Sequence, residues 1–397
     1  MGIELSERVQ SIKPSPTLVV GSRAAELRAE GRDIISLGAG EPDFDTPAHV
    51  KQAAKAALDA GFTKYTVVDG TPELKDAIIA KFARDNQLEY RRDQILVSCG
   101  AKHSIFNAMQ ALLDPGDEVI VPAPYWVSYP DMAMLCGAVP VFVDAGIESG
   151  FKMTPPALEG AITPRTRMLI LNSPSNPTGV CYNRDELAAL GEVLAARADI
   201  VIVSDDIYEH ILWADEPFSN ILNACPGLRD QTIVVNGVSK AYAMTGWRIG
   251  YAAGHPDVIR AMKKIQGQST SCPASVSQRA AEVALNGDHQ CVRDMVKVFR
   301  QRHDYVVGRL NRGNGVRCLK AQGAFYAFPD VRGAIEALDG IDDDVALAEY
   351  LLEEAGVALV PGSAFGTPGY LRLSYATGHE NLEKALDRMD RVFGTGL

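Results

Sequence analysis

Short β-branched runs alternate with helix-like stretches through the middle of the chain, and this alternation limits the fold more than any other feature of the sequence. It extends from about residue 90 to about residue 270. Strands that alternate with helices in this way are typical of a mostly parallel sheet with helices on both faces. We therefore predict an α/β fold. The apolar runs are QILVSC, DEVIVPAP, VPVFVDA, RMLILN, IVIVSDDIY, TIVVNGV and WRIGYAAG.

The pattern changes after about residue 300, where shorter strands and amphipathic helices follow one another. This change predicts a second, smaller α+β domain. We predict an N-terminal arm with part of the small domain at 1–45, a large domain at 46–295, and a small C-terminal domain at 296–397. The acidic triplet from Asp342 to Asp344 is predicted to begin a helix, because carboxylates stabilise the positive end of a helix.

Charge and composition exclude several classes of protein. The formal net charge of -11 disfavours nucleic-acid binding, which relies on an excess of Lys and Arg. The seven cysteines are scattered without metal-ligand spacing, so we expect reduced thiols and no metal site. The first residues carry charges where a signal peptide would be apolar, and no run approaches the roughly 20 apolar residues of a membrane helix. A soluble, cytoplasmic protein is expected.

Polar residues follow four of the predicted strands, at the sheet edge where open parallel sheets bind their ligands. We expect these four places to meet in one site. They are Gly100, Ala101 and Lys102 after QILVSC, Asn176 after MLILNSPS, Asp205 after IVIVS, and Ser239 with Lys240 after TIVVNGV.

Asp205 and Lys240 have the character of catalytic groups. A carboxylate at the end of an apolar strand needs a cation or strong donor, and a protonated pyridinium nitrogen would serve, with Tyr208 donating to the phenolate oxygen of the same ring. A metal-binding or loop-capping aspartate is an equal alternative for Asp205. Lys240 has apolar and aromatic neighbours, which favour the neutral amine that imine formation requires. Ser239 and Arg248 could bind a phosphate beside it.

Three further features are more ambiguous when each is taken alone. The Gly100 turn opens a helix whose free N–H groups suit a phosphate, but such a turn is more often only a turn. Trp126 could stack on a flat ring or simply pack in the core. Arg372 lies in an apolar strand and needs an anion, either a substrate carboxylate or an internal acidic partner. The segment from Gly38 to Gly40 lacks the third glycine and the helix of a dinucleotide-binding turn, which disfavours a nicotinamide cofactor.

Taken together, these residues resemble the class I, fold-type I aminotransferases, and the similarity extends along nearly the whole chain. The occurrence of all the matching motifs in this order is more specific than any single motif. The matching strings are GAGEPDFDTP, KYTVVDGTPELK, LDPGDEVIVPAPYWVSYP, NSPSNPTG, SDDIYEH, VSKAYAMTGWRIGY, PGSAFG and LRLSYAT.

The resemblance implies a large domain with a mostly parallel seven-stranded sheet, a small domain from both chain ends, and a homodimer with shared active sites. It implies pyridoxal 5′-phosphate as cofactor and Lys240 as its Schiff-base lysine. The other implied cofactor contacts are Asp205 to the ring nitrogen, Tyr208 and Asn176 to the ring oxygen, Trp126 stacking on the ring, and Gly100, Ala101, Lys102, Ser239, Arg248 and the partner's Tyr65 at the phosphate. Arg372, Asn176 and Gly40 would bind the substrate α-carboxylate, and Trp126 is implied to contact the substrate as well as the cofactor ring.

Two details refine this resemblance. Many relatives have Ser or Thr three residues before the lysine, where this chain has Gly237, so one phosphate contact is in doubt. The chain is most similar to a bacterial aspartate aminotransferase subgroup that includes users of prephenate. In that subgroup Lys102, Ser15 and Thr17 would bind the side-chain carboxylate, and Lys13 matches a lysine associated with prephenate. A flexible arm is an equal interpretation of this N-terminal stretch.

The implied reaction is a two-stage transamination between amino acids and 2-oxo acids. The predicted substrates are aspartate and 2-oxoglutarate, giving oxaloacetate and glutamate, with prephenate to arogenate as a further reaction. The alternatives are an aminotransferase for alanine, aromatic or methionine-type substrates, and a pyridoxal-phosphate C–S lyase.

Overall fold

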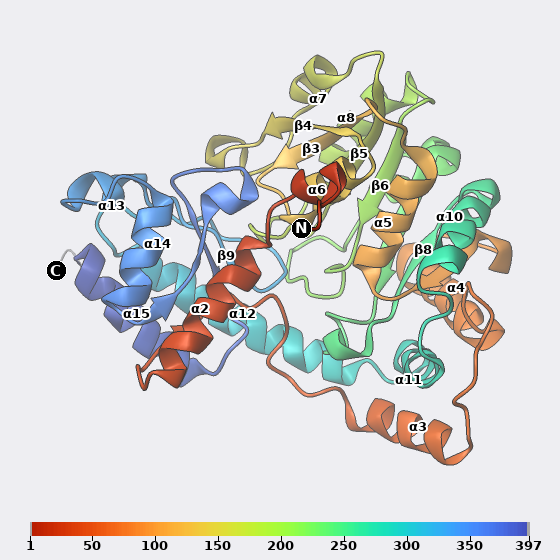
Figure 1. Ribbon diagram of the computed structural model, residues 1–397, viewed down its shortest axis with the longest axis horizontal. Helices are drawn as coiled ribbons and strands as arrows, with labels where there is room; N and C mark the ends of the chain where they lie inside the picture. The colour runs from red at the N-terminus through yellow and green to blue at the C-terminus, as the bar shows by residue number, and fades with distance from the viewer. Residues whose placement is uncertain (1, 395–397) are drawn as a thin grey trace.

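A seven-stranded sheet forms the centre of the larger part of the molecule in this computed structural model, which describes residues 2–394 (Figure 1). The strand order is β2-β8-β7-β6-β5-β3-β4. Only β8 runs against the other strands of this sheet, being antiparallel to both β2 and β7. The predicted mostly parallel sheet is confirmed. Its strands are β2 (Ile95–Ser98), β3 (Glu118–Ala123), β4 (Val139–Asp144), β5 (Thr166–Asn172), β6 (Val201–Asp205), β7 (Thr232–Gly237) and β8 (Gly250–Ala253).

Helices cover both faces of this sheet, because successive strand residues point to opposite faces and both sets are apolar. On β6, Ile202 packs into one buried cluster and Val203 into another. The first cluster includes residues of α4 (Pro72–Asn86), α7 (Pro155–Ala161), α8 (Arg184–Ala195), α9 (Ile221–Ala224) and α11 (Ser275–Asn286). The second includes residues of α5 (Ala101–Leu112), α6 (Ser128–Leu135) and α10 (Pro256–Ser269).

A second, smaller apolar core lies beside the large sheet and collects both ends of the chain. The strand near the N-terminus, β1 (Ile35–Ser36), pairs with β10 (Val357–Ala358). A three-stranded antiparallel sheet, β11-β12-β9, lies next to this pair. Its strands are β9 (Tyr326–Ala327), β11 (Val360–Pro361) and β12 (Leu371–Ser374), and the helices of this part are α2 (Pro16–Ala29), α12 (Gln290–Leu310), α13 (Arg332–Ala337), α14 (Asp344–Glu353) and α15 (His379–Phe393).

One long helix, α12, connects the two cores (Figure 1). Its Val292 belongs to a core of the large sheet, and its Phe299 belongs to the smaller core. The predicted boundary between 295 and 296 falls inside this helix, and the division of the chain into the three ranges stays a prediction.

The acidic triplet begins a helix, as predicted. Asp343 is the N-cap of α14, and its side chain accepts a hydrogen bond from the Ala346 amide at 2.8 Å. Asp344 is fully buried and accepts hydrogen bonds from the amide and hydroxyl of Ser363, both at 2.7 Å. This carboxylate therefore fixes the turn after β11 as well as the start of its own helix.

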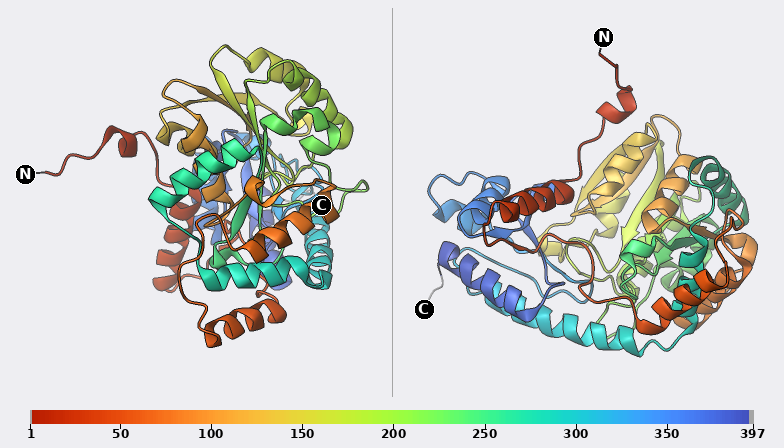
Figure 2. Two further views of the ribbon diagram at one scale, coloured as in Figure 1. Left: turned by 90° about the vertical axis from the view of Figure 1, so that its right-hand side faces the viewer. Right: turned by 60° about the horizontal axis from the view of Figure 1, so that its bottom comes forward.

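The first residues extend away from the rest of the molecule (Figure 2). They contain one short helix, α1 (Glu7–Gln10), and α2 then returns to the smaller core. Farther along the chain, α3 (Ala48–Asp59) packs against α11 and precedes the loop that leads to α4. Among the described residues, none of the helices has the length and hydropathy needed to span a membrane.

Candidate active site

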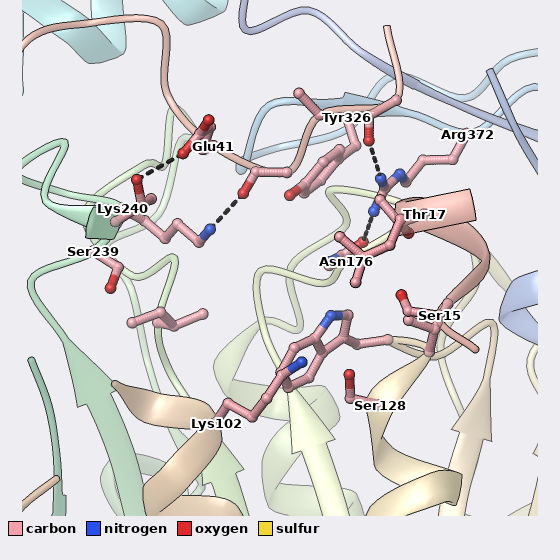
Figure 3. A pocket seen from close by; sticks show the side chains of 18 of the residues that line it. Ser15, Thr17, Glu41, Lys102, Ser128, Asn176, Ser239, Lys240, Tyr326 and Arg372 are labelled. Atoms are coloured by element: carbon pink, nitrogen blue, oxygen red, sulfur yellow. Dashed lines mark hydrogen bonds between the residues drawn. The ribbon is translucent and has the colours of Figure 1, made fainter. Parts of the chain in front are cut away.

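A cavity of about 710 Å³ lies at the carboxyl ends of the parallel strands, between the large sheet and the smaller core (Figure 3). Residues from all four predicted places line it, including Asn176, Asp205 and Lys240. Arg372 reaches the same cavity from β12. The expectation that the strand ends share one site is therefore confirmed by the geometry.

Asp205 is the last residue of β6 and is almost completely buried. The hydroxyl of Tyr129 donates a hydrogen bond to its Oδ2 at 2.6 Å, and the Ile207 amide donates to Oδ1 at 3.4 Å. Burial raises the pKa of Asp205 to about 6, although these hydrogen bonds and the charge of Lys240 oppose the change. The carboxylate is thus held in place at neutral pH but is poorly compensated by the protein alone.

Lys240 follows β7, and its side chain is directed into the cavity (Figure 3). Its ammonium donates to the carbonyl of Gly40 and lies about 6 Å from the ring centres of Tyr208 and Phe325. Burial lowers the pKa of Lys240 to about 8, and the charge of Arg248 acts in the same direction. About a tenth of the amine is then neutral at pH 7, far more than for an unperturbed lysine, and a nucleophilic lysine requires this neutral form.

An anion-binding turn lies at the start of α5. Gly100 has a φ of 89°, a conformation that favours glycine, and a Cβ built on it would lie 2.3 Å from Nη2 of Arg248. Only glycine lets that guanidinium approach the turn. Arg248 donates to the Thr245 carbonyl at 2.8 Å and to the Cys99 carbonyl at 3.4 Å, and both acceptors are neutral. The helix N-terminus at Ala101 adds its own positive end to this cation.

Arg372 is 2% exposed, and its contacts in the described residues are to neutral groups. It donates to Oδ1 of Asn176 at 3.0 Å and to the Gly38 carbonyl at 2.7 Å, and its Nε has no hydrogen-bond partner there. Burial lowers the pKa of Arg372, so the desolvation cost of this cation is not offset by an internal carboxylate. The alternative of an internal acidic partner is therefore wrong, and an external carboxylate fits.

A fourth cation, Lys102, lies at another side of the cavity (Figure 3). Its ammonium is 4.8 Å from the ring centre of Trp126. Ser15, the N-cap of α2, and Thr17, in its first turn, also line the cavity. Figure 3 shows Thr17 beside Arg372 and Ser15 between Thr17 and Ser128. The cavity thus holds separated cations, hydroxyl groups and a reactive amine in one space.

Comparison with known proteins agrees with this geometry. Residues 32–389 match the family described as aminotransferase class I and II. The chain belongs to the class I and II aminotransferases. It is 57% identical to the aspartate/prephenate aminotransferase of Nitrosomonas europaea, covering 98% of this chain and 99% of that protein. The Cereibacter sphaeroides protein of the same name is 54% identical, with 99% of each chain covered.

Solved structures of aspartate aminotransferases have the same fold. The Rhizobium meliloti enzyme superposes with a TM-score of 0.96 at 49% identity, covering 99% of this chain and 100% of that one. The Thermus thermophilus enzyme with maleate gives a TM-score of 0.92 at 46% identity, covering 98% and 100%. The fold is therefore that of fold-type I aminotransferases, as the sequence predicted.

Aminotransferases of this family use pyridoxal phosphate, and the cavity fits that cofactor. The Gly100 turn and Arg248 offer a phosphate site, and Ser239 adds a buried hydroxyl near it. Asp205 is an under-compensated buried carboxylate that suits a protonated ring nitrogen. Lys240 provides the amine for covalent attachment. The residues of the cavity thus offer separate partners for the phosphate, the ring nitrogen and the aldehyde of the cofactor.

Some predicted site residues lie elsewhere in the single chain. Tyr65 is 92% exposed and lies outside the cavity lining, and Lys13 is also exposed. Their implied contacts, Tyr65 with a partner subunit and Lys13 with prephenate, stay predictions. At Gly237 an added Cβ would lie 2.9 Å from the Ile249 carbonyl oxygen, so the pairing of β7 with β8 leaves no room for a Ser or Thr side chain at this position.

Two tyrosines belong to the site but were not found from the sequence. Tyr129 donates to Asp205, and the Tyr326 hydroxyl lies 2.9 Å from that of Tyr208. The Tyr326 ring also lies 4.7 Å from the Arg372 guanidinium. Tyr129 follows Trp126 by three residues, about one helical turn, and this spacing was the available signal.

Proposed function

We propose that this aminotransferase transfers the amino group of aspartate to 2-oxoglutarate, giving oxaloacetate and glutamate. The observation that carries the proposal is the pair of separated cations in one cavity, Arg372 and Lys102. A dicarboxylic substrate has one anionic group for each of them. The names of the relatives support this choice, and the Thermus thermophilus structure contains maleate, which is itself a dicarboxylate.

In the proposed reaction, Lys240 first attaches the cofactor and then moves a proton. Bound pyridoxal phosphate supplies an electron-withdrawing ring that stabilises negative charge at the substrate α-carbon. The neutral Lys240 amine would then take the proton from the substrate α-carbon and deliver it at C4′ of the cofactor. Its pKa of about 8 allows both directions near neutral pH.

Other side chains in the cavity hold the reacting groups in position. Asp205 would keep the ring nitrogen protonated, and Tyr129 holds that carboxylate in place. Tyr208 and Asn176 would donate to the ring oxygen, and Trp126 would stack on the ring.

The two ends of the substrate would meet different groups. Arg372, Asn176 and the Gly40 backbone would bind the α-carboxylate, where Arg372 lacks an internal anion. Lys102, Ser15 and Thr17 would bind the side-chain carboxylate. We propose prephenate as a further amino acceptor, with Lys13 approaching from the N-terminal arm.

A panel of substrates tests this proposal. Purified protein would be assayed with aspartate, glutamate, alanine, phenylalanine and methionine as donors, and with 2-oxoglutarate, oxaloacetate, prephenate and phenylpyruvate as acceptors. We expect the highest kcat/KM for aspartate with 2-oxoglutarate. Higher kcat/KM values for alanine or methionine would contradict it. Release of pyruvate, ammonia and sulfide from cysteine without an oxo-acid acceptor would indicate a C–S lyase.

Lys102→Ala should separate the two carboxylate sites. We expect KM for aspartate to rise about tenfold, because one charge-assisted contact is lost, while KM for alanine stays unchanged. Asp131→Asn is the matched control, since Asp131 is near Lys102 but does not line the cavity. An equal change for both amino acids would show that Lys102 does not bind the side-chain carboxylate.

We further propose a cytoplasmic homodimer in which each subunit contributes Tyr65 to the phosphate site of the other. The supporting observations are that Tyr65 is 92% exposed and that all seven cysteines are free thiols. Sedimentation of the holoenzyme should give about twice the chain mass. A monomer that is fully active would exclude the shared site.

A further inference from the structure

The loop between α3 and α4, residues 60–71, contains the exposed Tyr65 and is held by buried glutamines. We call it the Tyr65 loop. Gln278, on α11, is fully buried. Its Oε1 accepts from the Thr71 amide at 2.9 Å, and its Nε2 donates to the Thr66 hydroxyl and the Pro273 carbonyl, both at 2.8 Å. The loop is thus fixed by buried hydrogen bonds, while the ring of Tyr65 is almost fully exposed.

Gln266, on α10, is also fully buried and contacts this loop from another direction. Its Nε2 donates to the Val68 carbonyl at 2.7 Å and to the Val97 carbonyl at 2.8 Å. Val68 belongs to the Tyr65 loop, and Val97 belongs to β2. One amide group therefore ties the loop to the strand that leads into the Gly100 turn.

The oxygen of the same side chain holds the phosphate turn of its own subunit. The Ser98 hydroxyl donates to Oε1 of Gln266 at 2.7 Å, and Nδ2 of Asn107 donates to it at 3.1 Å. Ser98 precedes Gly100 by two residues, and Asn107 lies on α5, the helix that the turn opens. Gln266 thus contacts both sides of the turn.

Every hydrogen-bonding site of this buried amide is used, two donated and two accepted bonds. A saturated buried network costs more to break than an exposed one, because each lost partner leaves a buried polar group unpaired. Such a network also fixes the relative position of the segments that it joins. Here these segments are the Tyr65 loop and the phosphate turn.

We infer that Gln266 is a positioning residue for two active sites of the dimer at once. Through Ser98 and Asn107 it fixes the phosphate turn of its own subunit. Through Val68 it fixes the loop that presents Tyr65 to the partner's site. This inference rests on the homodimer proposed above, and it adds a single side chain through which the two phosphate sites are coupled.

Heterodimers separate the two effects. Each test substitution is placed in one of the two subunits. In the first arrangement, the subunit with the test substitution keeps Lys240 and is paired with a Lys240→Ala subunit. The cofactor site that is measured then lies in the same subunit as the test substitution. In the second, an unaltered subunit is paired with one that carries both Lys240→Ala and the change. Only a subunit with Lys240 attaches the cofactor covalently, so the absorbance of the attached cofactor reports one site. The measured quantity is the Kd for pyridoxal phosphate.

We expect Gln266→Met to raise this Kd about tenfold in both arrangements, because it removes partners from both segments. Ser98→Ala removes only the contact to the phosphate turn and should act only in the first arrangement. Gln278→Met loosens only the Tyr65 loop and should act only in the second. A general loss of folding would not produce these opposite patterns, and circular dichroism of each heterodimer checks that it is folded.

Four outcomes would overturn the inference. An effect of Gln266→Met in only one arrangement would show that it serves a single site. The same pattern for Ser98→Ala and Gln278→Met would show a general destabilisation. If Tyr65→Phe raised the Kd in the second arrangement but Gln266→Met did not, only the inference about Gln266 would be wrong. If Tyr65→Phe had no effect in that arrangement, the proposed shared site would be wrong as well. Because cofactor affinity is the readout, the absence of aspartate transamination would overturn the proposed function separately.

Discussion

Asp205 and Asp206 are neighbours in the chain, but their carboxylates belong to two different kinds of polar region. Asp205 faces the cavity with Lys240 and Arg372. Asp206 faces a buried cluster behind the cavity, where it accepts from the Ser204 hydroxyl at 2.7 Å and from Nδ2 of Asn220 at 3.0 Å. We call the second region the rear cluster, which consists of Lys81, Asn86, Ser204, Asp206, Glu209 and Asn220.

The rear cluster satisfies its own charges. Lys81 and Glu209 form an ion pair with side chains 0% and 2% exposed, and Nδ2 of Asn86 donates to Glu209 at 2.7 Å. Burial works to raise the pKa of Glu209, but Lys81 lowers it below its usual value. Burial and the charge of Glu209 raise the pKa of Asp206 to about 8, so Asp206 is mostly neutral at pH 7.

The cavity does not satisfy its charges in this way. Arg372 and Lys240 meet backbone carbonyls and a neutral amide, and burial lowers the pKa of both. Buried charge by itself therefore does not mark the active site, since both regions contain it. The mark is buried cationic charge that forms no ion pair: Arg372 has no carboxylate partner among the described residues, and Lys240 contacts a backbone carbonyl although the charges of Glu41 and Asp205 act on it.

The same comparison applies to Asp85, Glu209 and His210, whose ligand atoms lie within 4.8 Å of one another and could suggest a metal site. Glu209 is already paired with Lys81, and a second cation at this point would be repelled by that ammonium. We interpret these residues as an extension of the rear cluster.

The largest expected effect is at Lys240, and Lys81 is its matched buried lysine. Lys240→Ala should lower kcat by about 10⁴-fold or more, because the nucleophile and the proton carrier are lost together. Lys81→Met should lower stability but leave kcat of the folded enzyme within about threefold of the original. Steady-state kinetics on protein shown to be folded by circular dichroism would test this. A similar loss of kcat in both variants would remove the distinction between the two regions.

Asp205→Asn should lower kcat/KM by about a thousandfold, because the charge that stabilises the protonated ring is lost. The same substitution should stabilise the apoenzyme, that is, raise its free energy of unfolding. A folded-state pKa of about 6 lies above the unfolded value of 3.8, so the cost of ionising Asp205 in the folded apoenzyme builds up between these two pH values and is fully present above about pH 6. Asp205→Asn should therefore raise the free energy of unfolding by about 2 kcal/mol at pH 7, and this gain should vanish below about pH 4.

Urea denaturation of both apoenzymes at pH 7 and pH 4 measures that difference. A less stable Asp205→Asn apoenzyme at pH 7 would mean that the protein already compensates this carboxylate. Asp205 would then resemble the residues of the rear cluster.

Glu209→Gln should lower the free energy of unfolding by about 3 kcal/mol, because it leaves the Lys81 ammonium buried without its partner. Replacing both residues by methionine should recover most of this loss, since an apolar pair of similar size has no uncompensated charge. Denaturant titration of the single and double variants tests the pair. If the double variant were as unstable as the single one, the ion pair would be contributing net stability.

The smallest effect is a pH dependence at Lys240. Only the neutral amine attacks the cofactor aldehyde, so attachment to the apoenzyme should slow about tenfold per pH unit below pH 8 and become constant above about pH 9. Stopped-flow absorbance between pH 6 and pH 10 measures this rate. A midpoint near 10.5 would show that burial does not perturb this lysine, in contrast to the other buried groups of the cavity.

Much of the site could be predicted from the sequence because parallel strands place their carboxyl ends at one edge. The polar residues after β2, β5, β6 and β7 therefore had to lie close together. The residue types indicated the reaction. A lysine in apolar surroundings suits imine formation, and a carboxylate after an apolar strand suits a protonated ring nitrogen. Tyr129 and Tyr326 were missed because a tyrosine in an apolar segment does not reveal where its hydroxyl points.

The sequence by itself determined the alternation of strands and helices, the helix start at Asp343, and the set of polar residues at the strand ends, because these depend on local pattern and chain direction. Only the tertiary structure decided which charges are paired. Asp205 and Asp206 differ in the side chains that β6, α6 and the Asn220 segment bring to them, and Gln266 joins segments that are far apart in the chain. Such partners are set by packing between distant elements, and no local pattern contains that information.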